Sequence, residues 1–278
     1  MIVDKINQYL SSEKLALNDA ILAKVEKQAG IAFKRQFMDS ESYDGKGKIR
    51  LSSIGQCTRK LAYGYHGIPP NGKTIDSRGK MVFFQGDLVE LAIINLAKLA
   101  GCSIIGAGSD QTSVSYQVDD FELTGHPDGF LIYFGETYLV EIKSMASKSW
   151  PYFESGQIQP EYMAQIQSYM LCTGLGRTII VGLNKDIGVM HEIIVLRDKA
   201  FKDEIEQKTR KILLSNPELW PDRDYGPDKK GYLDWHCSYC SHWGTCWGDS
   251  VEKVVVNGAY KLKLKPIKKE EEKEDHEA

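Results

Sequence analysis

Residues 123–145, LTGHPDGFLIYFGETYLVEIKSM, constrain the fold of this chain more than any other segment. Two runs rich in β-branched and aromatic residues, 121–134 and 137–145, are separated by a short turn at Gly135-Glu136. Such runs predict two β-strands of one hairpin. Because helical and strand-like patterns flank this hairpin on both sides, we expect an α/β or α+β fold with one main core.

The remaining periodicity predicts helices that flank a mixed sheet. Apolar residues at helical spacing, or at strand-like spacing, identify each element. The expected elements are helices over 57–65, 79–100, 160–173 and 198–214, and strands over 112–118, 178–183 and 189–196. We expect packing helices in residues 1–40 and a disordered, charged tail over 265–278.

Composition excludes several classes of protein. The chain has 278 residues, of which 42% are hydrophobic and 26% charged, as in ordinary globular proteins. It has no run of about 18 apolar residues, and its first residues, MIVDKINQYL, lack a signal-peptide pattern. We therefore expect a cytoplasmic protein with no membrane contact, in which six cysteines are thiols or metal ligands rather than disulfides.

The net charge of -3 argues against a protein that coats nucleic acid by bulk charge, but this sum averages unlike regions. Residues 46–80 hold eight Lys and Arg against one acid, whereas residues 101–140 hold six acids and no Lys or Arg. A basic segment can follow phosphates while an acidic hairpin holds a cation.

Residues 67–74, GIPPNGKT, match the letters of a phosphate-binding loop. That loop works by pointing consecutive backbone N–H groups at phosphate, and Pro69 and Pro70 have none. The segment before it is not a continuous apolar strand, so we interpret these residues as a Pro/Gly turn.

Three side chains of the acidic hairpin predict a divalent-cation site. Glu141 and Lys143 lie two apart on a strand and therefore leave the same face. A hairpin also brings Asp128 close to Glu141, which gives two hard oxygen ligands of the kind Mg²⁺ prefers. Lys143 is then placed to orient or help deprotonate a metal-bound water and to stabilise a phosphate under attack. This chemistry is phosphodiester hydrolysis.

These residues resemble the motifs of the PD-(D/E)xK nuclease superfamily and, within it, the RecB-like exonucleases. The matches are G-x-x-D at Gly125–Asp128, E-x-K at Glu141–Lys143 and Q-x-x-x-Y at Gln165–Tyr169. The resemblance implies a restriction-endonuclease-like core over residues 41–250. It also implies that Asp128, Glu141 and the Ile142 carbonyl bind Mg²⁺ or Mn²⁺, that Lys143 is catalytic, and that Gln165 and Tyr169 line the DNA path. Tyr169 also fits a core position, because apolar residues surround it.

Members of this family carry a further metal ligand on an earlier helix, commonly a His four residues after a Gly. Counted from Gly86, that position here is Glu90, with Asp87 as a nearby competitor. A carboxylate is an acceptable hard ligand, so the resemblance assigns Glu90 to the metal. His126, directly before the motif, is expected to be structural.

Three cysteines lie within ten residues in the segment WHCSYCSHWGTCW. They predict either a structural Zn²⁺, with His236 or His242 as fourth ligand, or a 4Fe-4S cluster, which takes four thiolates. Cys57 stands far upstream, next to Arg59 and Lys60, which we expect to contact DNA. This arrangement resembles the iron-sulfur RecB-like nucleases of the Cas type. That resemblance implies an iron-sulfur clamp, joining the N- and C-terminal parts, whose ligands are Cys57, Cys237, Cys240 and Cys246.

The sequence thus predicts a metal-dependent DNA exonuclease that acts on single-stranded or unwound ends in repair, recombination, or phage or CRISPR DNA processing. It carries no credible helicase motor, so a helicase, recombination or CRISPR protein is an expected partner. Two alternatives stay open: a DNA-end-binding or assembly subunit with a weak or inactive site, and a zinc-stabilised protein that is not a nuclease.

Overall fold

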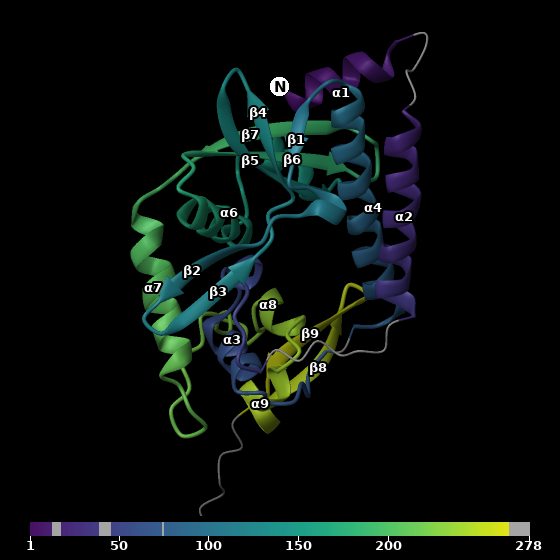
Figure 1. Ribbon diagram of the computed structural model, residues 1–278. Coiled ribbons are helices and arrows are strands. Elements are labelled where there is room, and N and C mark those ends of the chain that lie inside the picture. Colours follow the sequence, from purple (N-terminus) through teal and green to yellow (C-terminus); the bar gives the residue numbers. More distant parts are fainter. Residues whose placement is uncertain (13–17, 39–45, 74, 267–278) are drawn as a thin grey trace, which may run out of the picture.

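The computed structural model describes residues 1–12, 18–38, 46–73 and 75–266, and its centre is a five-stranded mixed sheet (Figure 1). The strand order is β1-β4-β5-β6-β7; β5 and β6 are parallel and the other neighbours antiparallel. Their bounds are β1 Ser103–Ile105, β4 Gly129–Tyr133, β5 Glu136–Met145, β6 Arg177–Asn184 and β7 Met190–Leu196. The central mixed sheet flanked by helices agrees with the expected α/β class.

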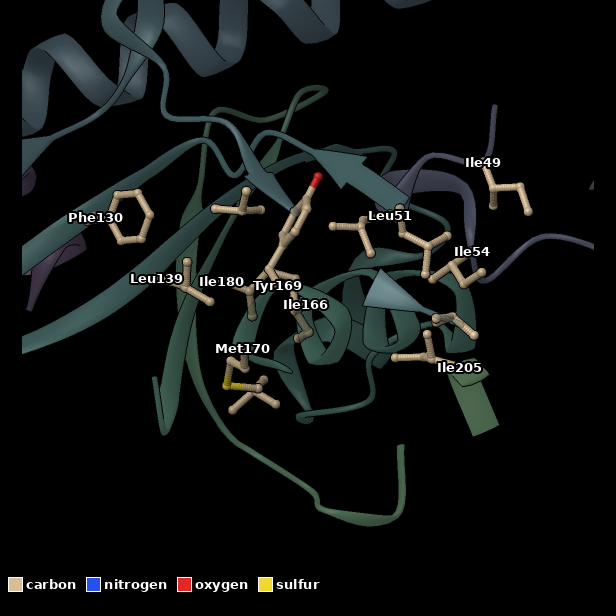
Figure 2. Packing of buried hydrophobic residues seen from close by; sticks show 14 of the residues in the cluster. Ile49, Leu51, Ile54, Phe130, Leu139, Ile166, Tyr169, Met170, Ile180 and Ile205 are labelled. Atoms are coloured by element: carbon tan, nitrogen blue, oxygen red, sulfur yellow. The ribbon is translucent and has the colours of Figure 1, made fainter. Parts of the chain in front are cut away.

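Helices cover both faces of this sheet. The α-helices of the described ranges, including those that lie away from the sheet, are α1 Ile2–Leu10, α2 Asp19–Phe37, α3 Thr58–Tyr65, α4 Ser77–Leu99, α5 Trp150–Glu154, α6 Pro160–Thr173, α7 Ala200–Leu213, α8 Trp235–Ser238 and α9 Trp243–Trp247. Helices α1 and α4 pack on one face through a buried cluster that includes Ile6, Ile93 and Val140. The other face packs on α6 and α7, and there Leu139 and Ile180 meet Ile166 in a second cluster (Figure 2). None of the helices in the described ranges is long and apolar enough to cross a membrane.

The expectation of one strand over 121–134 is wrong. Residues Phe121–Gly125 form β3, which pairs with β2, Val114–Val118, in a separate two-stranded sheet, whereas β4 joins the central sheet. Pro127 lies in the break, and its missing N–H cannot contribute to a continuous ladder. The expected turn is present but lies one residue earlier, at Phe134-Gly135, where both residues have positive φ, which suits a two-residue hairpin loop.

The lower part of Figure 1 is built from α3, α8, α9 and a hairpin of β8, Val251–Val256, and β9, Ala259–Leu264. The hairpin packs on α8 and α9 through a small cluster that includes Leu233, Val251, Leu262 and Trp243. The sequence patterns do not predict these two strands. In the phosphate-loop lookalike, the Gly72 and Lys73 amides donate to the Ser241 and Cys240 carbonyls at 2.6 and 3.1 Å, so they are not free to bind phosphate. The expected disordered tail falls, from residue 267 onward, outside the described residues.

Candidate active site

The β4–β5 register brings the motif carboxylates together. Gly129 pairs with Val140, so Asp128 stands one step beyond the ladder, at the level of Glu141. The Ile142 amide donates to Asp128 Oδ2 at 2.7 Å, which fixes that carboxylate against β5. The hairpin therefore does what its sequence predicts: it places two acids from separate motifs at one edge.

Glu141 is the most deeply buried of these acids, with 2% of the residue exposed. Its Oε1 accepts hydrogen bonds from Lys143 Nζ at 2.5 Å and from Gln165 Nε2 at 2.8 Å. Its Oε2 is buried without a hydrogen-bond partner among the residues that the structure describes. A buried carboxylate oxygen without a donor is costly and rare, and a cation is the group that most readily satisfies it.

Helix α6 supplies the third part of the site. Gln165 and Tyr169 lie one helical turn apart, and the Gln165 amide also accepts from Lys143 Nζ at 3.2 Å. The Tyr169 hydroxyl donates to the carbonyl of His126 at 3.1 Å, while its ring packs beside Ile166 and Met170 in the core (Figure 2). Tyr169 thus fits the core interpretation, because only 2% of the residue is exposed, and its hydroxyl also holds the segment that carries Asp128.

Glu90 on α4 is half-buried, and burial, then Glu141 and Asp87, raises its pKa to about 7. Its competitor is already paired: Asp87 accepts from Arg35 Nη2 at 2.5 Å and from Gln36 Nε2 at 3.1 Å, both on α2. Of the two acids on α4, Glu90 is therefore the one without a salt bridge to any residue that the structure describes.

The electrostatics of the site favour an added positive charge. Burial, Glu141 and Glu90 together raise the pKa of Asp128 well above its ordinary value. Burial lowers the pKa of Lys143, but the Glu141 and Asp128 carboxylates raise it by more. Lys143 is therefore a protonated donor at neutral pH, and the three acids oppose one another's ionisation unless a cation joins them.

The donor set fits Mg²⁺ or Mn²⁺, because all its atoms are hard oxygens and one of them lacks a partner. The side chains do not yet converge on one position: in the described ranges, no three His, Cys, Asp or Glu side chains are grouped closely enough to hold an ion. Binding of a metal would therefore require these side chains to move closer together.

All four cysteines expected in the clamp line one cavity of about 470 Å³. Cys57 is the N-cap residue of α3, and the other three come from α8, the residues after it, and α9. None is in a disulfide, and burial and then the neighbouring thiols raise the pKa of Cys240. The structure therefore brings Cys57 into one cavity with Cys237, Cys240 and Cys246, which are distant in sequence. In the described ranges, however, the thiols are not close enough together to coordinate one ion.

The histidines that a zinc site would need are placed differently. His236 has both ring nitrogens engaged, Nδ1 with Asp234 at 2.5 Å and Nε2 with Glu161. His242 does not line the cavity and packs its ring against Tyr63. Cys57 lines the cavity with a free thiol, whereas His236 lines it with both ring nitrogens engaged.

Arg59 and Lys60 also line this cavity, and Arg59 Nε donates to the Pro221 carbonyl at 2.5 Å. Sequence patterns did not indicate Arg223, whose Nε contacts Cys246 Sγ at 3.4 Å and whose guanidinium lies over the Trp247 ring. No periodicity or motif marks Arg223 in advance, because its contact arises from a loop.

No family model matches this chain, and no curated relative matches it by sequence. Solved structures do resemble it. An alkaline exonuclease of Laribacter hongkongensis, in its complex with dAMP, is 20% identical with a TM-score of 0.44, and the match covers 61% of this chain and 87% of that one. A phage-related exonuclease of Haemophilus somnus is 15% identical with a TM-score of 0.34, covering 59% and 90%. Both likenesses are weak.

Proposed function

We propose that this protein is a metal-dependent DNA exonuclease that hydrolyses phosphodiester bonds at single-stranded or unwound ends. The observation that carries the proposal is the buried Glu141 Oε2, which has no hydrogen-bond partner among the described residues and lies beside Lys143, Asp128 and Glu90. A cluster of acids that also includes a protonated lysine suits a cation and a phosphate together.

In this proposal Asp128, Glu141, Glu90 and the Ile142 carbonyl hold Mg²⁺ or Mn²⁺, which supplies an activated water and charge neutralisation at phosphorus. The Lys143 ammonium donates to the phosphate oxygen on which charge develops. The Gln165 amide bridges Lys143 and Glu141, because its oxygen accepts from the lysine and its nitrogen donates to the carboxylate. Tyr169 positions Asp128 through the His126 carbonyl. The water oxygen bonds to phosphorus, one bridging P–O bond breaks, and the leaving oxygen takes a proton.

The test uses 5′- and 3′-labelled single strands, both linear and circular, with Mg²⁺ or Mn²⁺. We expect linear strands to be shortened from an end and circles to survive. Lys143→Ala is expected to reduce the rate by about a hundredfold or more. Lys148→Ala is the matched control, because Lys148 is an exposed lysine just beyond the same strand. Full activity in the Lys143 variant would overturn the mechanism. Binding of ends without cleavage in any divalent metal would favour an end-binding subunit.

We also propose that the four thiols hold a 4Fe-4S cluster. The support is their shared cavity and their free state, together with the two histidines: His236 has both ring nitrogens engaged, and His242 does not line the cavity. Iron, sulfide and zinc are measured in anaerobically purified protein. About four irons and four sulfides per chain are expected. A colourless, zinc-containing sample would overturn the cluster and leave the nuclease proposal standing.

A further inference from the structure

A second cavity, of about 590 Å³, lies between the β8–β9 hairpin, α8 and the residues before α4. Its basic side chains include Lys73, Arg78 and Lys253. The acid in its lining, Asp76, accepts a hydrogen bond from the Gly79 amide at 2.7 Å and so caps α4. None of the three basic residues forms a salt bridge with an acid in the described ranges. With Lys261, the lining holds four basic side chains against one acid, so this groove has a net positive charge.

Aromatic rings line the same groove. Lys73 Nζ lies 4.2 Å from the centroid of the Tyr239 ring, and Lys253 Nζ lies 5.2 Å from that of Trp243. Tyr239 is 60% exposed and Tyr260 is 74% exposed. Such high exposure is unusual for aromatic side chains, which mostly pack into the core. Cations beside exposed rings form the surface that binds single-stranded nucleic acid, in which phosphates meet the cations and unpaired bases stack on the rings.

The groove continues toward the candidate active site. Tyr239 and Trp243 belong to its wall and also to the wall of the cysteine cavity. The wall of that cavity reaches Tyr162 and Gln165, and the Tyr162 ring lies 4.8 Å from Lys143 Nζ. A shared wall thus connects the basic groove with the residues around Glu141.

The groove is also a firm surface. The Leu262 amide donates to Ser238 Oγ at 3.3 Å, which joins the hairpin to α8. The Gly72 and Lys73 amides donate to the carbonyls of Ser241 and Cys240, which holds Lys73 against the segment of Tyr239. Aromatic platforms bind bases best when their geometry is set before the ligand arrives.

We propose that this groove is a binding site for a single strand of DNA, with phosphates on Lys73, Arg78 and Lys253 and an unpaired base stacked on Tyr260. The proposal deepens the proposed nuclease function and rests on it for the identity of the ligand. The nucleotides bound in the groove belong to the part of the DNA strand that is not being cut. The groove therefore gives the enzyme a preference for single strands over duplexes.

The test measures binding of a labelled single strand of about 20 nucleotides to the full chain in Ca²⁺ or EDTA, over a range of salt. We expect Lys73→Ala/Lys253→Ala to weaken binding about tenfold and to reduce the dependence of binding on salt by about one phosphate contact or more. Lys263→Ala is the matched control, because Lys263 lies on the same hairpin, has its own ring contact with Tyr232, and lines neither cavity. Lys261 is left intact, since it lines the groove but its ammonium lies over Tyr232.

A second pair of variants tests stacking. Tyr260→Ala is expected to weaken binding of the single strand about tenfold and to leave binding of a blunt duplex unchanged, whereas Tyr260→Phe retains binding. Unchanged single-strand binding in the double lysine variant, or an equal loss in Lys263→Ala, would overturn the site. Because binding is measured without cleavage, a wild-type protein that binds through this groove but does not cut would contradict only the nuclease proposal.

Discussion

Glu90 is the candidate ligand whose ionisation is changed most plainly by burial and by nearby charges. Its pKa of about 7 in the folded protein exceeds the ordinary value of 4.5, so the folded state binds the extra proton between these two values. The metal-free protein is therefore expected to lose stability as the pH rises through about 7. Measured by urea unfolding in EDTA, this loss from Glu90 alone amounts to up to about 3 kcal/mol between pH 5 and pH 8.5.

The comparison is with Glu90→Gln, which keeps the shape and removes the titration. The carboxyl of Asp128 has a raised pKa as well and contributes a slope of the same sign in both proteins. Only the difference between the two slopes therefore reports Glu90. If stability changed equally with pH in the two proteins, the pKa of Glu90 would be the same in the folded and unfolded states. With Mn²⁺ present, the wild-type protein should bind the metal more weakly below pH 7, since the proton competes for the same oxygen.

Tyr169 serves core and site at once, and two substitutions separate these roles. Tyr169→Phe keeps the ring among Ile166 and Met170 but removes the donor to the His126 carbonyl. We expect a loss of about 1 kcal/mol of stability and a clear fall in kcat with little change in DNA binding. Tyr169→Ala is expected to cost about 3 to 5 kcal/mol, because it leaves a cavity. Wild-type kcat in the Phe variant would make Tyr169 a core residue only.

At the scale of elements, packing explains why the G-x-x-D motif has a glycine at position 125, which the sequence alone does not reveal. Gly125 ends β3, and a Cβ there would lie 2.8 Å from Tyr169 Cε1 and 3.0 Å from Leu51 Cβ. Gly125→Ala should therefore displace the Tyr169 ring and cost about 1 to 3 kcal/mol in thermal or urea unfolding. Gly176→Ala is the control, since a Cβ there meets nothing within 4 Å. Equal stability of the two variants would contradict this packing.

The elements with strong periodicity could be predicted from the sequence, and those that depend on tertiary contacts could not. Helix α6 has the predicted bounds, Pro160–Thr173, because Pro160 begins it and Gly174 ends it in the left-handed conformation. Two apolar runs that look continuous in sequence belong to different sheets, since Pro127 interrupts the ladder. The β8–β9 hairpin has a readable Asn257-Gly258 turn, but no local pattern shows that it packs against α8.

The same division holds for the candidate site. The E-x-K spacing places Glu141 and Lys143 on one face, and the two side chains are in contact. The partner of Asp87 could not be predicted, because Arg35 reaches it from α2, which is distant in sequence. Contacts within one strand follow from its period, whereas contacts between elements depend on how the whole chain packs.

At the scale of the whole molecule, the four cysteines come together in one cavity from distant parts of the sequence. Cys57 and Cys237 enclose about 180 residues, so a cluster that binds both restrains the unfolded chain strongly. The proposed cluster would also hold α3 against α8 and α9, which contribute Ser238 and Trp243 to the wall of the basic groove. We expect Cys246→Ser to lower iron content, reduce thermal stability by several degrees and weaken binding of single strands. The readouts are iron analysis, thermal unfolding and the binding assay.

Cys172→Ser is the matched control for this variant. Cys172 is half-buried against the main core, and its thiol lines neither the cysteine cavity nor the basic groove. Burial raises its pKa to about 12, which marks an inert thiol rather than a ligand. Its substitution should lower stability through packing but leave iron content intact. If both serine variants retained iron equally, Cys246 would not be a ligand. If Cys246→Ser lost iron but bound DNA normally, the groove would keep its shape without the cluster, and the clamp would serve stability alone.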